Sequence, residues 1–156
     1  MKKTNLFPIV LAAIGFLALL AFLLIGVARI AVYGGNEGPL LGFYSAFGIR
    51  FKFLGSPVHF SGVNWWGLAV MVVIALASVC SGILTKNHRG WYYVSAVLAV
   101  AAAFIVFFYH KSIVKMNSVS FSIVRIGAGQ IISGSLLAIM AIGNVFAAYQ
   151  DKQTSK

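Results

Sequence analysis

Four long apolar runs dominate the pattern of hydrophobic and polar positions along this chain. They extend over about residues 6–33, 63–84, 91–109 and 126–149. Each run reaches the ~20 residues that an α-helix needs to cross a hydrocarbon core of about 30 Å. A strand of a membrane barrel would need only about 9–11 residues with strict alternation, so helix is the expected structure. The pattern predicts an all-α integral membrane protein, a four-transmembrane-helix bundle that forms a single domain over residues 1–156.

Aromatic side chains lie at the ends of these runs. Trp65 and Trp66 open the second run, Trp91 opens the third, and Tyr109 and Tyr149 close the third and fourth. Tryptophan and tyrosine are enriched at the level of the lipid headgroups. Their positions therefore support the boundaries of the predicted spans.

The connection over residues 34–62 is the one long loop between predicted spans. Within it, Phe51 and Phe53 alternate with Arg50 and Lys52. A period of two residues is typical of a half-buried strand. The pattern predicts a short strand with an aromatic side and a basic side.

A second short strand is expected after a break at residues 55–57, with His59 facing away from Val58 and Phe60. The first interpretation is a β-hairpin that lies on the ends of the helices. The alternative is an interfacial segment whose aromatic side chains enter the headgroup layer while its basic side chains contact phosphate. In both cases residues 48–62 are the predicted recognition surface.

Composition excludes a soluble domain, since 61% of the residues are hydrophobic and 9% are charged, against roughly 25% charged in soluble proteins. The acids are Glu37 and Asp151, which three predicted spans separate, so paired-carboxylate catalysis within one chain is excluded. Cys80 is the single cysteine, which excludes a disulfide within the chain and a CxxC redox pair. We therefore expect no enzymatic activity, no metal site and no cofactor.

We expect a multi-pass protein of the cell membrane with both termini in the cytoplasm, and the charges next to the first span are the basis for this orientation. Lysine and arginine are balanced on the two sides of the predicted spans, so the positive-inside rule by itself gives no orientation. Lys2 and Lys3 directly precede the first span, and the first helix usually dominates.

The outer face then carries a large excess of basic residues over one acid, Glu37. One interpretation is that arginines at span ends extend toward the headgroups and the other basic residues meet lipid phosphate. The other is a docking surface for an anionic partner, attracted by a field that salt screens. Membrane lipids, other membrane subunits or a second copy are the expected partners, and nucleic acid is not. The candidate partner-binding or lipid-binding residues are Arg50, Phe51, Lys52, Phe53, His59, Lys111 and Lys115.

The fourth run contains a seven-residue repeat of small residues at Gly127, Gly134 and Ala141, with Gln130 and Asn144 on the same broad face. Small residues let membrane helices approach closely, and buried amides form hydrogen bonds between helices. The pattern predicts a helix-packing face, within this chain or against another subunit. The alternative is that Gln130 and Asn144 line a polar pathway.

The layout of four spans with a long, strand-containing first loop is similar to that of claudin-like tetraspan proteins. That family's first loop carries a tryptophan-glycine-leucine-tryptophan cluster and a pair of cysteines. Here Trp65-Trp66-Gly67-Leu68 departs from that pattern, and Cys80 lies within a span. The resemblance therefore covers the layout and implies no function.

Two classes of function remain. The first is a non-catalytic accessory, assembly or protective subunit that packs on a larger membrane complex and uses the basic and aromatic loop for recognition. The second is a transport or channel component that works as an oligomer.

Overall fold

A computed structural model of the chain describes residues 6–32, 37–53, 56–58, 62–86, 88–115 and 121–154. The fold is mostly helical. Its elements in chain order are α1 (Phe7–Leu24), β1 (Gly26–Val32), β2 (Gly38–Leu41), α2 (Gly42–Phe47), β3 (Phe51–Phe53), β4 (Ser56–Val58), α3 (Trp65–Gly82), a 3-10 turn η1 (Leu84–Lys86), α4 (Gly90–Lys115), β5 (Phe121–Ile126) and α5 (Ala128–Thr154).

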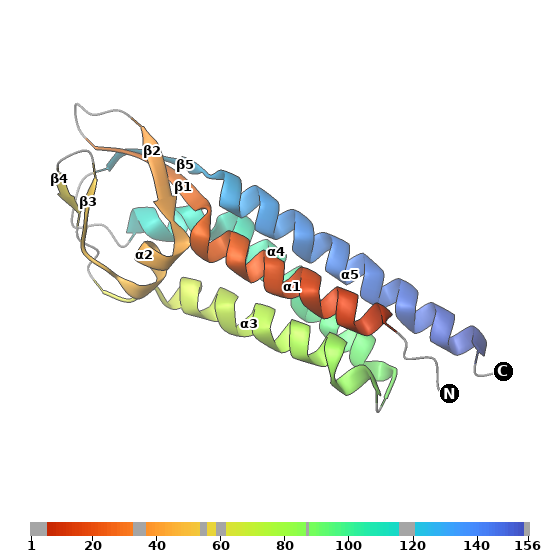
Figure 1. Cartoon of the computed structure of the whole chain (residues 1–156). Coiled ribbons are helices and arrows are strands. Elements are labelled where there is room, and N and C mark those ends of the chain that lie inside the picture. The colour runs from red at the N-terminus through yellow and green to blue at the C-terminus, as the bar shows by residue number, and fades with distance from the viewer. Residues whose placement is uncertain are drawn as a thin grey trace.

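The long helices α1, α3, α4 and α5 form a bundle in which successive helices run in opposite directions (Figure 1). α1 and α4 each pack against both α3 and α5. Among the described residues, four helices are long and apolar enough to cross a membrane. This confirms the predicted set of four membrane-length helices and is compatible with a multi-pass membrane protein.

Apolar side chains fill the inside of the bundle and also cover its outside. One large, fully buried side chain from each long helix contributes to the central core: Phe22, Ile74, Val106 and Leu137. On the outside, Phe16 and Ile142 are 57% and 71% exposed. A helix that is hydrophobic on all sides is typical of a membrane span. The outward apolar surface therefore agrees with the composition.

The prediction of an all-α fold is wrong at the end of the first run. α1 ends at Leu24, and residues Gly26–Val32 form strand β1 instead of continuing the helix toward residue 33. β1 is the central strand of a three-stranded antiparallel sheet with the order β2-β1-β5. A short apolar segment has no period that distinguishes strand from buried helix. Pairing with β5, which is distant in the sequence, stabilises the strand conformation of Gly26–Val32 over a continued helix.

The hairpin predicted in the long loop is present, because β3 and β4 pair antiparallel, with Phe51 opposite Val58 and Phe53 opposite Ser56. Its second strand includes Ser56 and Pro57, which the sequence pattern assigned to the break. His59 lies outside the described residues.

The other span boundaries also shift. α3 begins at Trp65 because the side chain of Asn64 caps it, accepting hydrogen bonds from the backbone N–H groups of Trp66 and Gly67. α4 continues past Tyr109 to Lys115. The fourth helix begins at Ala128 rather than 126, since residues Phe121–Ile126 belong to β5.

The strands and α2 together lie at one end of the bundle, and the start of α1 and the end of α5 lie at the other end (Figure 1). We call the assembly of β1, β2, α2, β3, β4 and β5 the cap. Glu37 directly precedes β2 in the cap, whereas Asp151 lies near the end of α5. The two acids are therefore at opposite ends of the bundle, as the sequence predicts.

Candidate functional site

The sheet of the cap brings two arginines together. In the pairing of β1 with β5, Arg29 lies directly opposite Arg125, and both residues are exposed. Like charges directly opposite each other on neighbouring strands are destabilising. Arg125 forms a long ion pair with Glu37, with Nη1 3.8 Å from Oε1. Because both side chains are partly exposed, this pair contributes little stability.

Positive charge therefore remains in excess at the cap end. In the described part of the chain, the exposed basic residues there are Arg29, Arg50, Lys52, Lys111 and Arg125, and the one acid is Glu37. Arg50 directly precedes β3 and Lys52 lies within it. The sheet and the hairpin thus present basic side chains from three separate segments of the sequence.

The sequence-predicted recognition residues are only partly gathered here. Arg50 and Lys52 lie on the hairpin, and Lys111 lies on α4 one turn before its end. Lys115 is the last residue of α4, and Phe51 and Phe53 belong to β3, but their side chains are outside the described set. The pairing of Arg29 with Arg125 was missed, because each was interpreted separately as a residue at the end of a span.

A buried polar cluster holds the cap on the helices. The hydroxyl groups of Ser45 in α2 and Tyr109 in α4 are 2.9 Å apart and share a hydrogen bond. Asn64, at the start of α3, donates from Nδ2 to Ser112 Oγ of α4 at 2.9 Å. Three elements are therefore joined beneath the basic surface by side chains that water does not reach freely. Such satisfied buried networks rigidify the structure around them.

Gly67 makes this cluster sterically possible. A Cβ atom at this position would lie 2.8 Å from the Tyr109 hydroxyl and 2.8 Å from the Cβ of Ala46. Both distances are shorter than side chains tolerate, so α3 reaches α2 and α4 this closely only with glycine here.

The predicted packing residues of the fourth apolar run are all buried inside the chain. Gly127 lies against the backbone of β1, and Gly134 lies against the ring of Phe107 in α4. Ala141 belongs to a buried cluster with Ala99 of α4 and Met140. The small residues thus contact other elements of this chain, and the first of them contacts a strand rather than a helix.

The two amides of α5 form hydrogen bonds with other helices. Asn144 Oδ1 accepts from Ser81 Oγ of α3 at 2.9 Å. Gln130 Nε2 donates to the Val106 carbonyl of α4. Among the described residues, Gln130 Oε1 and the Ser133 hydroxyl are buried with no hydrogen-bond partner.

Along α5, the segment between the two amides is mostly apolar, but it includes the buried Ser133 and the exposed Ser135. Leu137 and Met140 are both 0% exposed, and they separate Gln130 from Asn144. On the buried face of α5, Leu137 and Met140 therefore interrupt the polar residues between Ser133 and Asn144.

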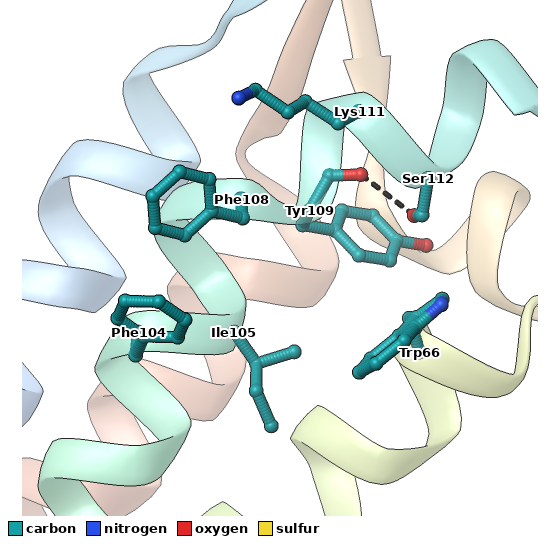
Figure 2. A pocket seen from close by; sticks show the side chains of 7 residues that line it. All are labelled: Trp66, Phe104, Ile105, Phe108, Tyr109, Lys111 and Ser112. Atoms are coloured by element: carbon teal, nitrogen blue, oxygen red, sulfur yellow. Dashed lines mark hydrogen bonds between the residues drawn. The ribbon is translucent and has the colours of Figure 1, made fainter.

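Two hollows open on the sides of the bundle. One, of about 220 Å³, lies between α3 and α4 near the cap, with Lys111 in its lining (Figure 2). The other, of about 750 Å³, is a groove between α4 and α5 with apolar and aromatic walls that include Val97, Ile142 and Phe146. The second has no charged lining residue that would select an occupant. Within the described ranges, no group of three or more histidine, cysteine, aspartate or glutamate residues could hold a metal ion.

Comparison of the chain with protein-family models, curated proteins and solved structures finds no significant match. The class defined here, a bundle of four membrane-length helices with a small sheet at one end, therefore rests on the geometry alone.

Proposed function

We propose that the protein is a non-catalytic accessory or assembly subunit that packs on a larger membrane complex and binds an acidic segment of it through the basic cap. In this proposal the four long helices cross the cell membrane, both termini are cytoplasmic, and the cap lies on the outer side. The complementary charge of the partner would be supplied by aspartate and glutamate side chains of an exposed loop.

The observation that carries the proposal is the placement of Arg29 directly opposite Arg125 on paired strands. Within the described residues Arg29 has no ion-pair partner, and Glu37 offsets the charge of Arg125 only at 3.8 Å. Like charges that face each other lower the stability of the fold, and arrangements that lower stability with no compensating contact in the same chain are most often found at functional sites. An acidic partner supplies the missing counter-charge.

The rest of the cap supports the same role. The buried cluster of Ser45, Tyr109 and Asn64 holds α2 and the start of α3 on α4, and α2 in turn contacts β1 and β2, so the sheet that carries Arg29 is held in place before a partner binds. A preorganised surface loses less conformational entropy on binding. Arg50 and Lys52 extend the positive surface to the hairpin, and their field would steer an anionic partner at low salt.

The test is purification of the full chain in mild detergent from its native membrane, with quantitative mass spectrometry of co-purifying proteins. Arg50→Glu combined with Lys52→Glu reverses charge on the hairpin without touching the bundle. We expect it to remove the partner. Arg89→Glu combined with Lys152→Glu makes the same change at the opposite end, on two exposed residues, and should retain the partner.

A second measurement separates function from folding. Arg29→Gln removes the repulsion with Arg125 and should stabilise the isolated protein by about 0.2–1 kcal/mol, while weakening retention of the partner. If the wild-type chain purifies alone at low salt, or if both double variants retain the same partner equally, the proposal is wrong.

The alternative, a transport component acting as an oligomer, draws on the buried, unpartnered Gln130 Oε1 and Ser133 Oγ. The buried Leu137 and Met140 between Gln130 and Asn144 interrupt a polar path along α5, which supports the accessory role instead. Gln130→Leu combined with Asn144→Leu would decide in favour of transport if flux were lost while assembly stayed intact.

A further inference from the structure

The smaller hollow on the side of the bundle has a distinctive lining (Figure 2). Trp66 forms the wall on α3, and it lies opposite Ile105 and Tyr109 of α4. The wall on α4 is formed by Phe104, Ile105, Phe108, Tyr109, Lys111 and Ser112. At about 220 Å³, the cavity is below the range of about 300–1,000 Å³ that is typical of sites for whole small molecules. It can therefore enclose only part of a larger ligand.

The two hydroxyl groups of this lining are already engaged within the chain. The Tyr109 hydroxyl shares a hydrogen bond with Ser45. Ser112 Oγ donates to the Tyr109 carbonyl at 2.7 Å and accepts from Asn64. Apart from Lys111 and the indole N–H of Trp66, what remains for a ligand is an aromatic and aliphatic wall, so an apolar group is the expected content of the cavity.

Lys111 adds a positive charge at the edge of that wall. Its ammonium group lies 5.0 Å from the centre of the Phe108 ring, which is a cation–π contact. The side chain is exposed, and within the described residues it has no ion-pair partner. The cation is therefore available to an anion while its aliphatic stem lies along aromatic surface.

The cavity also lies at a suitable level of the bundle. Trp66 is the second residue of α3 and Lys111 is one turn from the end of α4, so both mark where membrane-length helices end beside the cap. Trp66 and Phe104 are 60% and 65% exposed on the side of the bundle. Tryptophan and lysine at a span end occupy the headgroup level, where phosphate lies above the first methylenes of an acyl chain.

We propose that this cavity binds one anionic phospholipid, with its phosphate at the Lys111 ammonium and the first part of an acyl chain between Trp66 and the phenylalanines of α4. The lining matches a ligand that is negative at one end and apolar directly below. An acidic protein segment would supply the charge without the apolar chain. The lipid site is independent of the acidic partner proposed for the cap, because neither Trp66 nor Lys111 belongs to the sheet or the hairpin.

Trp66 itself can report the bound lipid. The chain has three tryptophans, so Trp65→Phe combined with Trp91→Phe leaves Trp66 alone. The matched reporter, Trp66→Phe combined with Trp91→Phe, leaves Trp65, which is 77% exposed and is not part of the lining. Both full-length proteins are reconstituted into vesicles that contain brominated phosphatidylglycerol or brominated phosphatidylcholine, and quenching of fluorescence is measured.

We expect the Trp66 reporter to prefer the anionic lipid about two- to fivefold, the range for a partly exposed charge pair. The Trp65 reporter should show a smaller preference, set by general attraction to the basic cap. Equal preference at both tryptophans would overturn the proposal, since the anionic lipid would then be attracted by the cap without a site.

Substitutions in the Trp66 reporter separately test the contact with the lipid phosphate and the contact with the acyl chain. Lys111→Gln should lower the anionic preference to the level of the Trp65 reporter, whereas the same change at the exposed Lys152, at the opposite end of the bundle, should leave it unchanged. Ile105→Phe fills the cavity and should reduce quenching by both lipids. Thermal unfolding of each variant is measured as a control, to select the variants whose fold is intact. Retention of the full anionic preference by the folded Lys111→Gln protein, or unchanged quenching in folded Ile105→Phe, would show that the cavity is not the site.

Discussion

Gly127 lies where the chain leaves β5 and enters α5, and its replacement by alanine tests how the sheet is attached to the bundle. A Cβ atom here would lie 2.1 Å from the Gly26 carbonyl oxygen and 2.6 Å from the Ala28 nitrogen. Both atoms belong to the backbone of β1, so no side-chain rotation can make room. The backbone of Gly127 does not adopt a positive φ angle, so the effect of Gly127→Ala is purely steric.

The size of the effect can be worked out from these contacts. Side-chain carbons essentially never come closer than 3.0 Å to such atoms, so β1 and the start of α5 must separate by about 0.9 Å. Overpacking of this kind costs about 1–3 kcal/mol. The same movement weakens the hydrogen bond from the Gly127 N–H to the Val27 carbonyl, 3.1 Å long, which is worth about 1 kcal/mol. The expected total is about 2–4 kcal/mol, or a fall in Tm of about 4–16 °C for a chain of this length.

The assay is thermal unfolding of the purified protein in detergent, followed by circular dichroism. Gly90→Ala is the matched control, because a Cβ at Gly90, the first residue of α4, meets no atom within 4 Å. It should leave Tm unchanged or raise it slightly, since alanine restricts the unfolded chain. If Gly127→Ala unfolds at the same temperature as Gly90→Ala, the close approach of β1 to α5 is refuted.

Two further predictions concern the bundle and its orientation. Asn144→Leu should cost about 1 kcal/mol because it leaves the buried Ser81 hydroxyl without its acceptor, and adding Ser81→Ala should recover part of the loss. Purely additive effects in this double-mutant cycle, measured by thermal unfolding, would contradict the hydrogen bond. For orientation, a membrane-impermeant thiol reagent added outside intact cells should label Ser56→Cys but not Ser155→Cys. The native Cys80 is buried and should give little background, and labelling with the opposite preference would reverse the proposed topology.

The basic residues illustrate the limit of sequence-based inference for the site. Alternation of charge and aromatic side chains identified Arg50, Lys52 and the strand that carries them, because a period of two is a local property. Arg29 and Arg125 gave no such signal. Each is a single charge next to an apolar run, and their meeting depends on the pairing of β1 with β5.

For the packing residues at the start of α5 and along it, the sequence likewise predicted the buried face but not the residues that this face contacts. Repetition of small residues and the presence of two amides predicted a buried face over Gly127–Asn144, because hydrocarbon disfavours isolated polar groups. The partners of that face could not be predicted. Gly127 contacts β1, and Asn144 reaches Ser81 on α3, since these contacts depend on how the helices are arranged around the core.

Four apolar runs of membrane length determine four helices by themselves, because in hydrocarbon each backbone N–H and C=O must find its partner within its own segment. The Asn64 cap likewise sets the start of α3 through local contacts, whereas Tyr109, which was predicted to close the third span, lies within α4. Tertiary structure alone decided that residues Gly26–Val32 are a strand and that two arginines face each other. It also placed Trp66 opposite α4, where Lys111 borders the same cavity. Each of these features requires contact between segments that are distant in the sequence, and the free energy that selects them arises from pairing and packing rather than from local pattern.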